Sequence, residues 1–386
     1  MSGPQLRAGV RERADDEREV RPVELFFDLV YVLAVTQVTH YLLDHLTARG
    51  MVETLILLLV VWLGWIHVVW TTNYIHLGTM RVRLMLLGLM LAGLVMSASL
   101  PEAFGDRGLA FAFAAVALIL LSSAFFLFAI GRDHRLSRII ERAAIWWTAV
   151  CALLVAGALV DGDARLAIWL VAVALAYTVM WVGFPVPRLG RSVTGDYTIL
   201  GDLFTHRCYL FITIALGESI LVTGSSFGAL PGSSGTTAAF VVAFVGSVAL
   251  WWIYFHHGHE IVRAMAAAED PGRLALRGYT YFHVPMIVGI IALAAADELA
   301  LAHPGEDATA EIAAIILGGA AIYLTGTILF RRSVQGRVMP ARVAGVVALC
   351  ALVPVAFVAS TLVLLLAANA VLVAVAAWEA WAWRSR

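Results

Sequence analysis

The segment VELFFDLVYVLAVTQVTHYLL (residues 23–43) is long and apolar enough to cross a lipid bilayer. Its two acidic residues, Glu24 and Asp28, are separated by one helical turn, so they share a face of the predicted helix. A carboxylate within the hydrocarbon costs about 3 kcal/mol or more unless it is protonated, paired or hydrated. The segment therefore predicts a membrane helix whose acidic face meets water, a cation or a basic partner.

The composition of the whole chain extends this interpretation. Of the 386 residues, 61% are hydrophobic and only 14% are charged, which is typical of polytopic membrane proteins and excludes an ordinary soluble domain. A membrane helix needs about 20 mostly apolar residues, and twelve such stretches follow one another with short connections. We therefore expect an all-α, polytopic membrane protein with twelve transmembrane helices, whose first partner is the lipid bilayer.

The basic residues predict the orientation of the chain. All 26 of them are arginines, and basic loops resist translocation across the membrane. If the N-terminus is cytoplasmic, only Arg49, Arg107 and Arg165 fall outside. Residues 1–22 have no apolar core like that of a signal peptide and are expected to form a polar cytoplasmic tail. The distribution predicts a multi-pass protein of the cell membrane with both termini in the cytoplasm.

Several function classes find no support in the chain. Its three cysteines, Cys151, Cys208 and Cys350, are scattered and form neither a disulfide framework nor a metal motif. We find no phosphate-binding glycine loop, nucleophile elbow or zinc-protease motif, and no basic, aromatic-interleaved surface typical of nucleic-acid binding. We therefore expect no catalytic residue, metal, cofactor or nucleic-acid partner, while a homo-oligomer stays an open possibility.

An internal repeat is suggested by identities at a constant spacing of 196 residues. If this is a duplication, the unit has six helices, and an even number places both copies in the same orientation. The predicted division is a tail at 1–22, a first repeat at 23–191 and a second repeat at 192–386. The matched residues are Arg81, Met90, Gly93, Ala98 and Glu102, which recur as Arg277, Met286, Gly289, Ala294 and Glu298.

Glu218 is the acidic residue predicted to lie deepest in the membrane. It follows His206, near the start of the span expected at 203–224, by twelve residues, or roughly 18 Å of helix. An ionisable group at that depth must face the interior of the bundle, and such groups are functional hypotheses by default. Glu218 and the adjacent Ser219 are therefore predicted to line an ion or substrate pathway, the alternative being a structural hydrogen-bond partner.

The other polar residues of the first and seventh spans complete the predicted site. Arg207 is expected to neutralise an acid of another helix, with Asp28 as its partner, and Arg21 is the alternative partner of the acidic pair. Gln37 and His40, in the outer half of the first span, are predicted either to line the pathway or to bond neighbouring helices. Asp297 and Glu298 are expected at the water boundary at the outer end of their helix.

Five ordered segments carry a resemblance over nearly the whole chain: RPVELFFDLVYVLAVTQVTHYL (21–42), MLAGLVMSASLPEAF (90–104), RCYLFITIALGESILVTG (207–224), HVPMIVGIIALAAADELALAHP (283–304) and IYLTGTILFRR (322–332). Together they resemble the bacterial low temperature requirement A family. The resemblance implies a multi-spanning membrane protein associated with growth at low temperature. The chain departs from the family's usual pattern where acidic residues are common, at His206 and within NYIHLG (residues 73–78).

A second resemblance concerns function. The run FFDLVYVLAVT (residues 26–36) is similar to the pore-lining Phe-Ser-Asp signature of a potassium-channel family built from two six-helix repeats, although Phe27 replaces the serine. We therefore expect a permease for an unknown ion or small solute, with Glu24, Asp28 and Glu218 on the pathway. The alternatives are an intramembrane enzyme acting on a lipid-like substrate and a non-catalytic membrane protein that supports growth at low temperature.

Overall fold

The computed structural model describes residues 20–75, 78–130, 136–197, 199–230, 232–256 and 258–384. Residues 1–19 of the predicted N-terminal tail lie outside the described residues. Within the described ranges the chain is almost wholly helical, without a β-ladder, and twelve helical runs are long and apolar enough to cross a membrane. The all-α fold and the twelve-span, multi-pass architecture expected from the composition are confirmed.

The chain divides into two compact units, which are described separately. The first unit comprises residues 1–37, 55–210 and 265–276, and the second comprises residues 38–54, 211–264 and 277–386. Three long helices contribute residues to both units, so the units do not follow the order of the sequence. The division into two parallel six-helix repeats stays a prediction.

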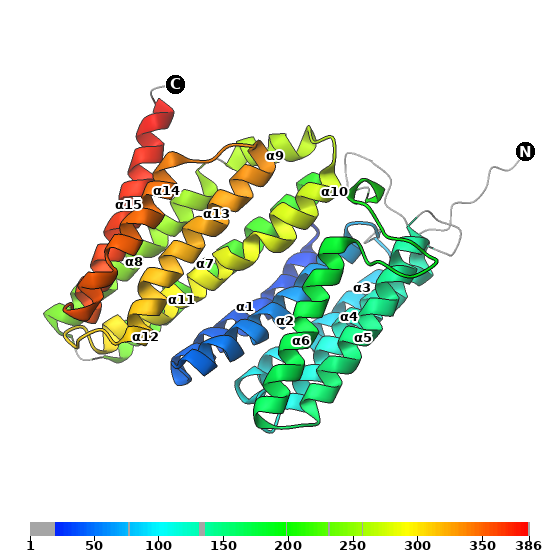
Figure 1. Cartoon of the computed structure of the whole chain (residues 1–386), viewed down its shortest axis with the longest axis horizontal. Coiled ribbons are helices and arrows are strands. Elements are labelled where there is room, and N and C mark those ends of the chain that lie inside the picture. Colours follow the sequence, from blue (N-terminus) through cyan, green and yellow to red (C-terminus); the bar gives the residue numbers. More distant parts are fainter. Residues whose placement is uncertain are drawn as a thin grey trace, which may run out of the picture. The chain divides into compact units, whose positions relative to one another are not determined.

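The first unit is a bundle in which helices that follow one another in sequence pack side by side, α3 on α4, α4 on α5 and α5 on α6 (Figure 1). Its elements are α1 (Pro22–Asp44, up to residue 37), α2 (Ala48–Thr72, from residue 55), α3 (Met80–Ser99) with a 3₁₀ turn (Leu100–Glu102), α4 (Gly108–Ile130), α5 (Ser137–Ala158), α6 (Gly162–Val182), a 3₁₀ turn (Thr194–Asp196), the start of α7 (Gly201–Ala229) and the short α10 (Pro271–Arg273).

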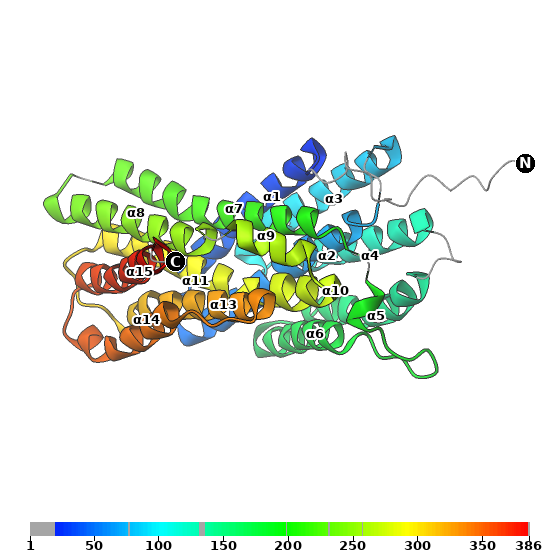
Figure 2. The same ribbon diagram turned by 90° about the horizontal axis from the view of Figure 1, so that it is seen from above.

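In the second unit, α11 packs against α8 and α13, and α15 packs against α8 and α14 (Figure 2). Its elements are the second part of α7, α8 (Ser234–Phe255), α9 (Gly258–Ala266, up to residue 264), most of a π-helical segment (Leu274–Tyr281), α11 (His283–Ala302), α12 (Ala310–Ala313), a π turn (Ala314–Gly318), α13 (Gly319–Gln335), α14 (Pro340–Ala351), a 3₁₀ turn (Val353–Phe357) and α15 (Thr361–Arg384).

Small residues set the close approach of α11 and α13. A Cβ added to Gly289 would lie 2.5 Å from the carbonyl oxygen of Gly319 and 2.6 Å from the Cβ of Tyr323. The two backbones therefore meet where no side chain separates them, as is common between helices in lipid. The hydroxyl of Tyr323 donates to the carbonyl oxygen of Leu250 at 2.6 Å and ties α13 to α8 as well.

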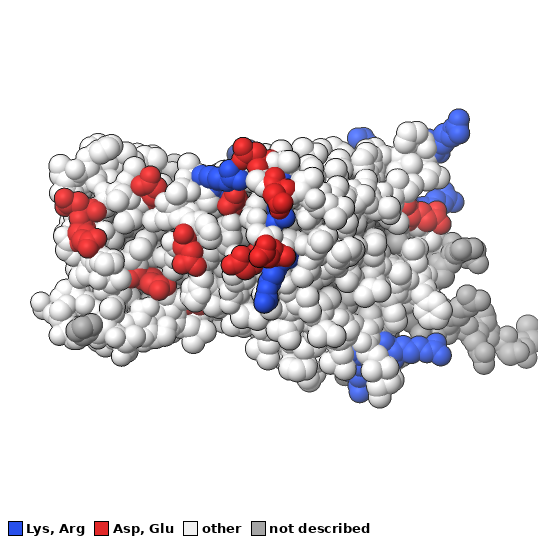
Figure 3. All heavy atoms as spheres, turned by 90° about the horizontal axis from the view of Figure 1, so that it is seen from below, with Lys and Arg blue, Asp and Glu red and all other residues white. Residues whose placement is uncertain are grey.

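The surfaces of both units fit a bilayer environment. Large apolar side chains are widely exposed, including Leu91 at 63% and Phe128 at 71% in the first unit and Val347 at 63% in the second. Figure 3 shows several separate acidic patches on one face of the second unit. Glu306 and Asp307 are exposed in the loop at the end of this unit between α11 and α12. This is the end of the second unit that the arginine distribution predicts to face away from the cytoplasm.

Candidate functional site

The first unit contains a buried cluster of Glu24, Asp28 and Arg207, which we call the arginine triad. Glu24 and Asp28 come from the start of α1, and Arg207 comes from the first turns of α7. The guanidinium of Arg207 donates to Oε1 of Glu24 at 2.9 Å and to Oδ1 of Asp28 at 2.7 Å. Side-chain exposures are 1% for Arg207, 0% for Glu24 and 3% for Asp28, so all three groups are removed from solvent.

Aromatic side chains and one backbone group complete the surroundings of the triad. The indole N–H of Trp65 on α2 donates to Oδ1 of Asp28 at 2.7 Å. The rings of Phe27 and Trp65 each lie 5.9 Å from the guanidinium carbon of Arg207, within the range of a cation–π contact. Arg21 contributes its backbone N–H, which donates to Oε2 of Glu24 at 3.1 Å. The expected contact between Arg207 and Asp28 is present, and Glu24 joins it.

The charges within the triad do not balance. Two carboxyl groups share one guanidinium, and among the described residues neither Oδ2 of Asp28 nor Nε of Arg207 has a hydrogen-bond partner. Burying an unbalanced carboxylate is expensive, so the second carboxyl group requires a proton or a further cation to be neutral. The triad therefore links α1 to α7 in the first unit, and it contains one more acidic group than basic group.

The second unit contains a different cluster, formed by Ser219, Ser247 and Asp297, which we call the carboxyl–hydroxyl cluster. The hydroxyl of Ser219 on α7 donates to Oδ2 of Asp297 on α11 at 2.7 Å, and it lies 2.8 Å from the hydroxyl of Ser247 on α8. With the Ser219 proton directed to the carboxylate, Ser219 can accept from Ser247. Exposures are 2% for Ser219, 6% for Ser247 and 4% for Asp297, and the neighbouring Glu218 is 2% exposed.

Asp297, which was expected at the outer end of its helix, is not exposed there. Its carboxylate is buried against the two hydroxyls because α7, α8 and α11 pack around it. Ser247 is thirteen residues from the start of α8 and Asp297 is five residues from the end of α11, roughly 20 Å and 8 Å along the two helix axes, so the cluster lies between packed helices and inside the ends of both. Among the described residues no basic side chain forms an ion pair with Asp297. A carboxyl group at this depth without a counter-charge must carry a proton or bind a cation.

The remaining predicted site residues lie outside both clusters. Gln37, in the first unit, is half-buried, and His40, in the second unit, is exposed. Within the described residues neither has a hydrogen bond that joins it to the triad or to the carboxyl–hydroxyl cluster. Their assignment to a pathway stays a prediction.

Sequence reasoning missed a third buried ionic contact, between α14 and α15 in the second unit. Arg342 donates to both carboxylate oxygens of Glu379, at 2.7 and 2.9 Å, and also to the carbonyl oxygen of Ile253 at 2.9 Å. The exposures of the two side chains are 1% and 2%. Arg342 lies in the first turn of its helix and Glu379 lies near the end of the next. Charged residues near helix ends are usually solvated, so nothing in the sequence indicates that these two are paired.

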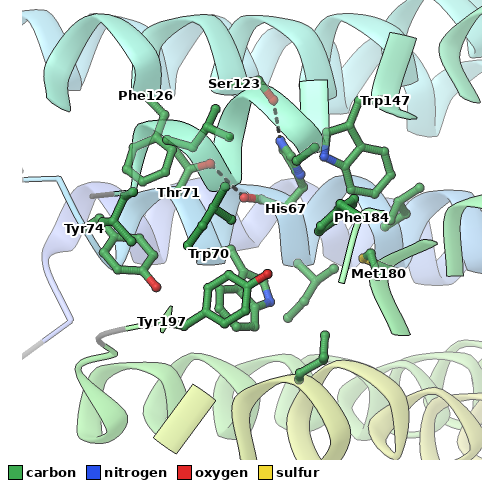
Figure 4. Close-up of a pocket in the computed structure, with 17 residues that line it drawn as sticks. His67, Trp70, Thr71, Tyr74, Ser123, Phe126, Trp147, Met180, Phe184 and Tyr197 are labelled. Atoms are coloured by element: carbon green, nitrogen blue, oxygen red, sulfur yellow. Dashed lines mark hydrogen bonds between the residues drawn. The ribbon is translucent and has the colours of Figure 1, made fainter. Parts of the chain in front are cut away.

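A cavity of about 110 Å³ lies within the first unit (Figure 4). His67 and Ser123 form part of its wall, with His67 Nε2 and the serine oxygen 2.9 Å apart. Tyr197 is also in the wall, and burial raises the pKa of its phenol to about 12. The wall is formed by Leu63, Ile66, His67, Trp70, Thr71, Tyr74, Ser123, Phe126, Leu136, Ile139, Ile140, Ala143, Trp147, Met180, Phe184, Tyr197 and Leu276.

The chemistry of this cavity differs from that of the two acidic clusters. No Asp, Glu or Arg belongs to its wall, and six of its seventeen lining residues are Phe, Tyr or Trp. Such a wall suits apolar, uncharged groups and has no formal charge to balance that of an ion. The triad, the carboxyl–hydroxyl cluster and the Arg342–Glu379 pair lie outside this cavity.

Comparisons with known proteins agree on one family. The family described as "Bacterial low temperature requirement A protein (LtrA)" matches residues 19–377. A protein of Rhizobium meliloti (strain 1021), named "Uncharacterized protein RA0937", is 35% identical over 378 residues, which cover 96% of this chain and 91% of that protein. No solved structure matches the chain.

Proposed function

The chain belongs to the bacterial low temperature requirement A family, and we propose that it is a permease for an ion or small solute whose transport is coupled to a proton or a monovalent cation. The protein acts in the cell membrane with both termini in the cytoplasm. Glu218 and the carboxyl–hydroxyl cluster form the coupling site, and the arginine triad is the ordering network near the cytoplasmic mouth.

The observation that carries this proposal is the buried carboxyl group of Asp297. It accepts a hydrogen bond from Ser219 at 2.7 Å, and its charge is not balanced by a basic group among the described residues. A carboxylate and two hydroxyls are hard oxygen ligands, which suit a proton or Na⁺ and do not suit a soft metal. Secondary transporters commonly hold their coupling ion near the bilayer midplane in this way.

The cost of the empty site explains how coupling would arise. An ionised Asp inside a membrane helix costs up to about 3 kcal/mol, which corresponds to as much as a roughly 150-fold bias toward the occupied, neutral form. The helices that carry the cluster therefore rearrange mainly when a proton or cation is bound. The hydrogen-bonded hydroxyls of Ser247 and Ser219 provide a route by which a proton reaches Asp297.

The arginine triad supports a different role. Its two carboxyl groups are held by the planar guanidinium of Arg207 and by the indole of Trp65, so their geometry is fixed by bonds that are costly to break. A group anchored in this way is suited to hold α1 against α7 in the first unit. We assign Glu24 and Asp28 to the ordering network and the exchange of charge to Glu218 and Asp297.

The test is a flux screen of the purified protein in liposomes, across monovalent cations, anions and small solutes, with and without a pH gradient. Asp297→Asn removes the titratable group while keeping its shape, and Glu218→Gln does the same one residue before Ser219. Each variant is expected to abolish flux or its dependence on the proton or cation gradient. Asp307→Asn is the matched control, because Asp307 is exposed in the loop between α11 and α12.

Each outcome of the screen bears on the proposal. Unchanged flux and unchanged pH dependence in both Asp297→Asn and Glu218→Gln would refute the assignment of the coupling site. Conversion of a membrane lipid without flux would point to the intramembrane enzyme. If neither flux nor turnover is observed, the remaining interpretation is a non-catalytic membrane protein that supports growth at low temperature. The native mass of the reconstituted protein tests whether it is a homo-oligomer.

A further inference from the structure

The second unit contains a larger cavity, of about 460 Å³, at the end where α13, α14 and α15 meet α9. This end carries the loop between α13 and α14, on the side predicted to be cytoplasmic. The volume falls within the range of small-molecule sites, about 300–1,000 Å³. The wall is formed by Glu260, Arg331, Gln335, Arg337, Val338, Met339, Pro340, Ala341, Trp378, Glu379, Ala382 and Trp383.

The wall takes its basic character from one stretch of sequence. Residues 331–342 contain four arginines, and no acidic residue occurs between Glu311 and Glu379. Arg331 and Arg337 line the cavity. The Arg331 side chain is only 2% exposed, so it is held in place by packing, whereas Arg337 is exposed and free to adjust to a ligand.

The two acidic residues of the wall are already engaged. Both oxygens of Glu379 accept hydrogen bonds from Arg342, at 2.7 and 2.9 Å. Glu260 accepts a hydrogen bond from Gln335 at 3.1 Å and lies 3.9 Å from Arg331. Counting Arg342, the site has three arginines and two glutamates, and one positive charge is left in excess. This excess matches the single negative charge of a phosphodiester.

The tryptophans at the end of α15 place the cavity at the edge of the bilayer. Trp378, Trp381 and Trp383 are 48%, 69% and 46% exposed, and exposed tryptophans concentrate at the level of the lipid headgroups. Trp378 and Trp383 also line the cavity. A ligand in this cavity would therefore contact the tryptophan rings on its apolar side and the arginines on its polar side, at the level of the lipid headgroups.

We propose that this cavity binds the phosphodiester headgroup of an anionic phospholipid, with Arg331 and Arg337 as the groups that contact the phosphate. Arginine guanidinium groups match phosphate oxygens in geometry and charge. The N-terminus of α14 at Pro340 borders the same cavity, and its dipole also favours an anion. Basic pockets between membrane helices on the cytoplasmic side are a recurrent form of lipid headgroup site. This site is separate from the proposed coupling site.

The test measures lipid retention by native mass spectrometry of the full-length protein in neutral detergent, titrated with phosphatidylglycerol or with phosphatidylcholine. Phosphatidylglycerol is expected to be retained and phosphatidylcholine is not. Arg337→Gln is expected to weaken retention of phosphatidylglycerol about fivefold, and Arg337→Lys is expected to recover part of it. Arg332→Gln is the matched control, because Arg332 is equally exposed but does not line the cavity.

A separate titration with glycerophosphoglycerol, the soluble phosphodiester headgroup of phosphatidylglycerol, distinguishes the source of the phosphate. Retention of phosphatidylglycerol without binding of glycerophosphoglycerol identifies a lipid site. Binding of glycerophosphoglycerol that Arg337→Gln weakens identifies a site for a soluble phosphodiester. Equal retention of the two lipids, or equal losses for Arg337→Gln and Arg332→Gln, would overturn the proposal. None of these results depends on flux, so the permease assignment stands or falls independently.

Discussion

Replacing Arg207 by glutamine should be one of the most destabilising single changes in the first unit. The change leaves Glu24 and Asp28, which are 0% and 3% exposed, without their guanidinium. Removing one partner of a buried ion pair costs about 3–5 kcal/mol, and here one cation serves two acids, so we expect the upper end of that range. The cation–π contacts with Phe27 and Trp65 are lost as well.

Asp28→Asn should behave in the opposite way. It removes the excess acidic group, while the amide oxygen still accepts from Arg207 and Trp65, so we expect a loss of no more than about 1 kcal/mol. The free energy of unfolding of both variants can be measured by steric trapping in bicelles. A triple variant, Arg207→Gln with Glu24→Gln and Asp28→Asn, should recover most of the loss.

A larger loss of unfolding free energy for Asp28→Asn than for Arg207→Gln would contradict this description of the triad. A loss below about 1 kcal/mol for Arg207→Gln would mean that the triad is hydrated. A loss for Asp28→Asn as large as that for Arg207→Gln would mean that both carboxylates are ionised and that each is required.

Three further predictions concern the second unit. Gly289→Ala should lower the free energy of unfolding by about 1–3 kcal/mol, because its Cβ would clash with α13. Gly318→Ala is the control in the same assay and should be close to neutral, because nothing lies within 4 Å of the new carbon. Arg342→Gln should destabilise the protein by about 3–5 kcal/mol. The double variant Arg342→Met with Glu379→Leu should recover most of that loss, because it buries no unpaired charge. A double variant as unstable as Arg342→Gln alone would contradict this. Glu306→Cys, in a chain whose three cysteines are replaced by serine, should react with a membrane-impermeant maleimide added to intact cells, and labelling only after lysis would reverse the assigned topology.

The helices could be predicted closely because their signal is local. The span expected at 203–224 is observed as α7 at Gly201–Ala229, and both contain the same apolar run. The eleventh of the twelve apolar stretches, residues 341–360, is less regular, since α14 ends at Ala351 and a 3₁₀ turn follows over Val353–Phe357. Pro354 explains the break, because proline cannot donate the backbone hydrogen bond that would continue the α-helix.

The acidic face of α1 was also predictable, since Glu24 and Asp28 share it by helical periodicity alone. The sequence suggested one partner, Asp28, for Arg207, and the tertiary structure brought in Glu24 and Trp65 as well. Asp297 shows the limit of local reasoning. Its distance from the end of α11 suggested a hydrated acid, and only the packing of α7 and α8 against α11 buried it.

By itself, the sequence determined the membrane environment, the number of spans and the residues expensive enough to need an explanation, because hydropathy and periodicity are summed along a chain. The tertiary structure decided which of those residues are neutralised. Arg207 balances one of the two acids of α1, Arg342 balances Glu379, and Asp297 is left with hydroxyls. Charge balance depends on atoms that lie within about 4 Å of each other in space, and no pattern along one helix records which other helix supplies them.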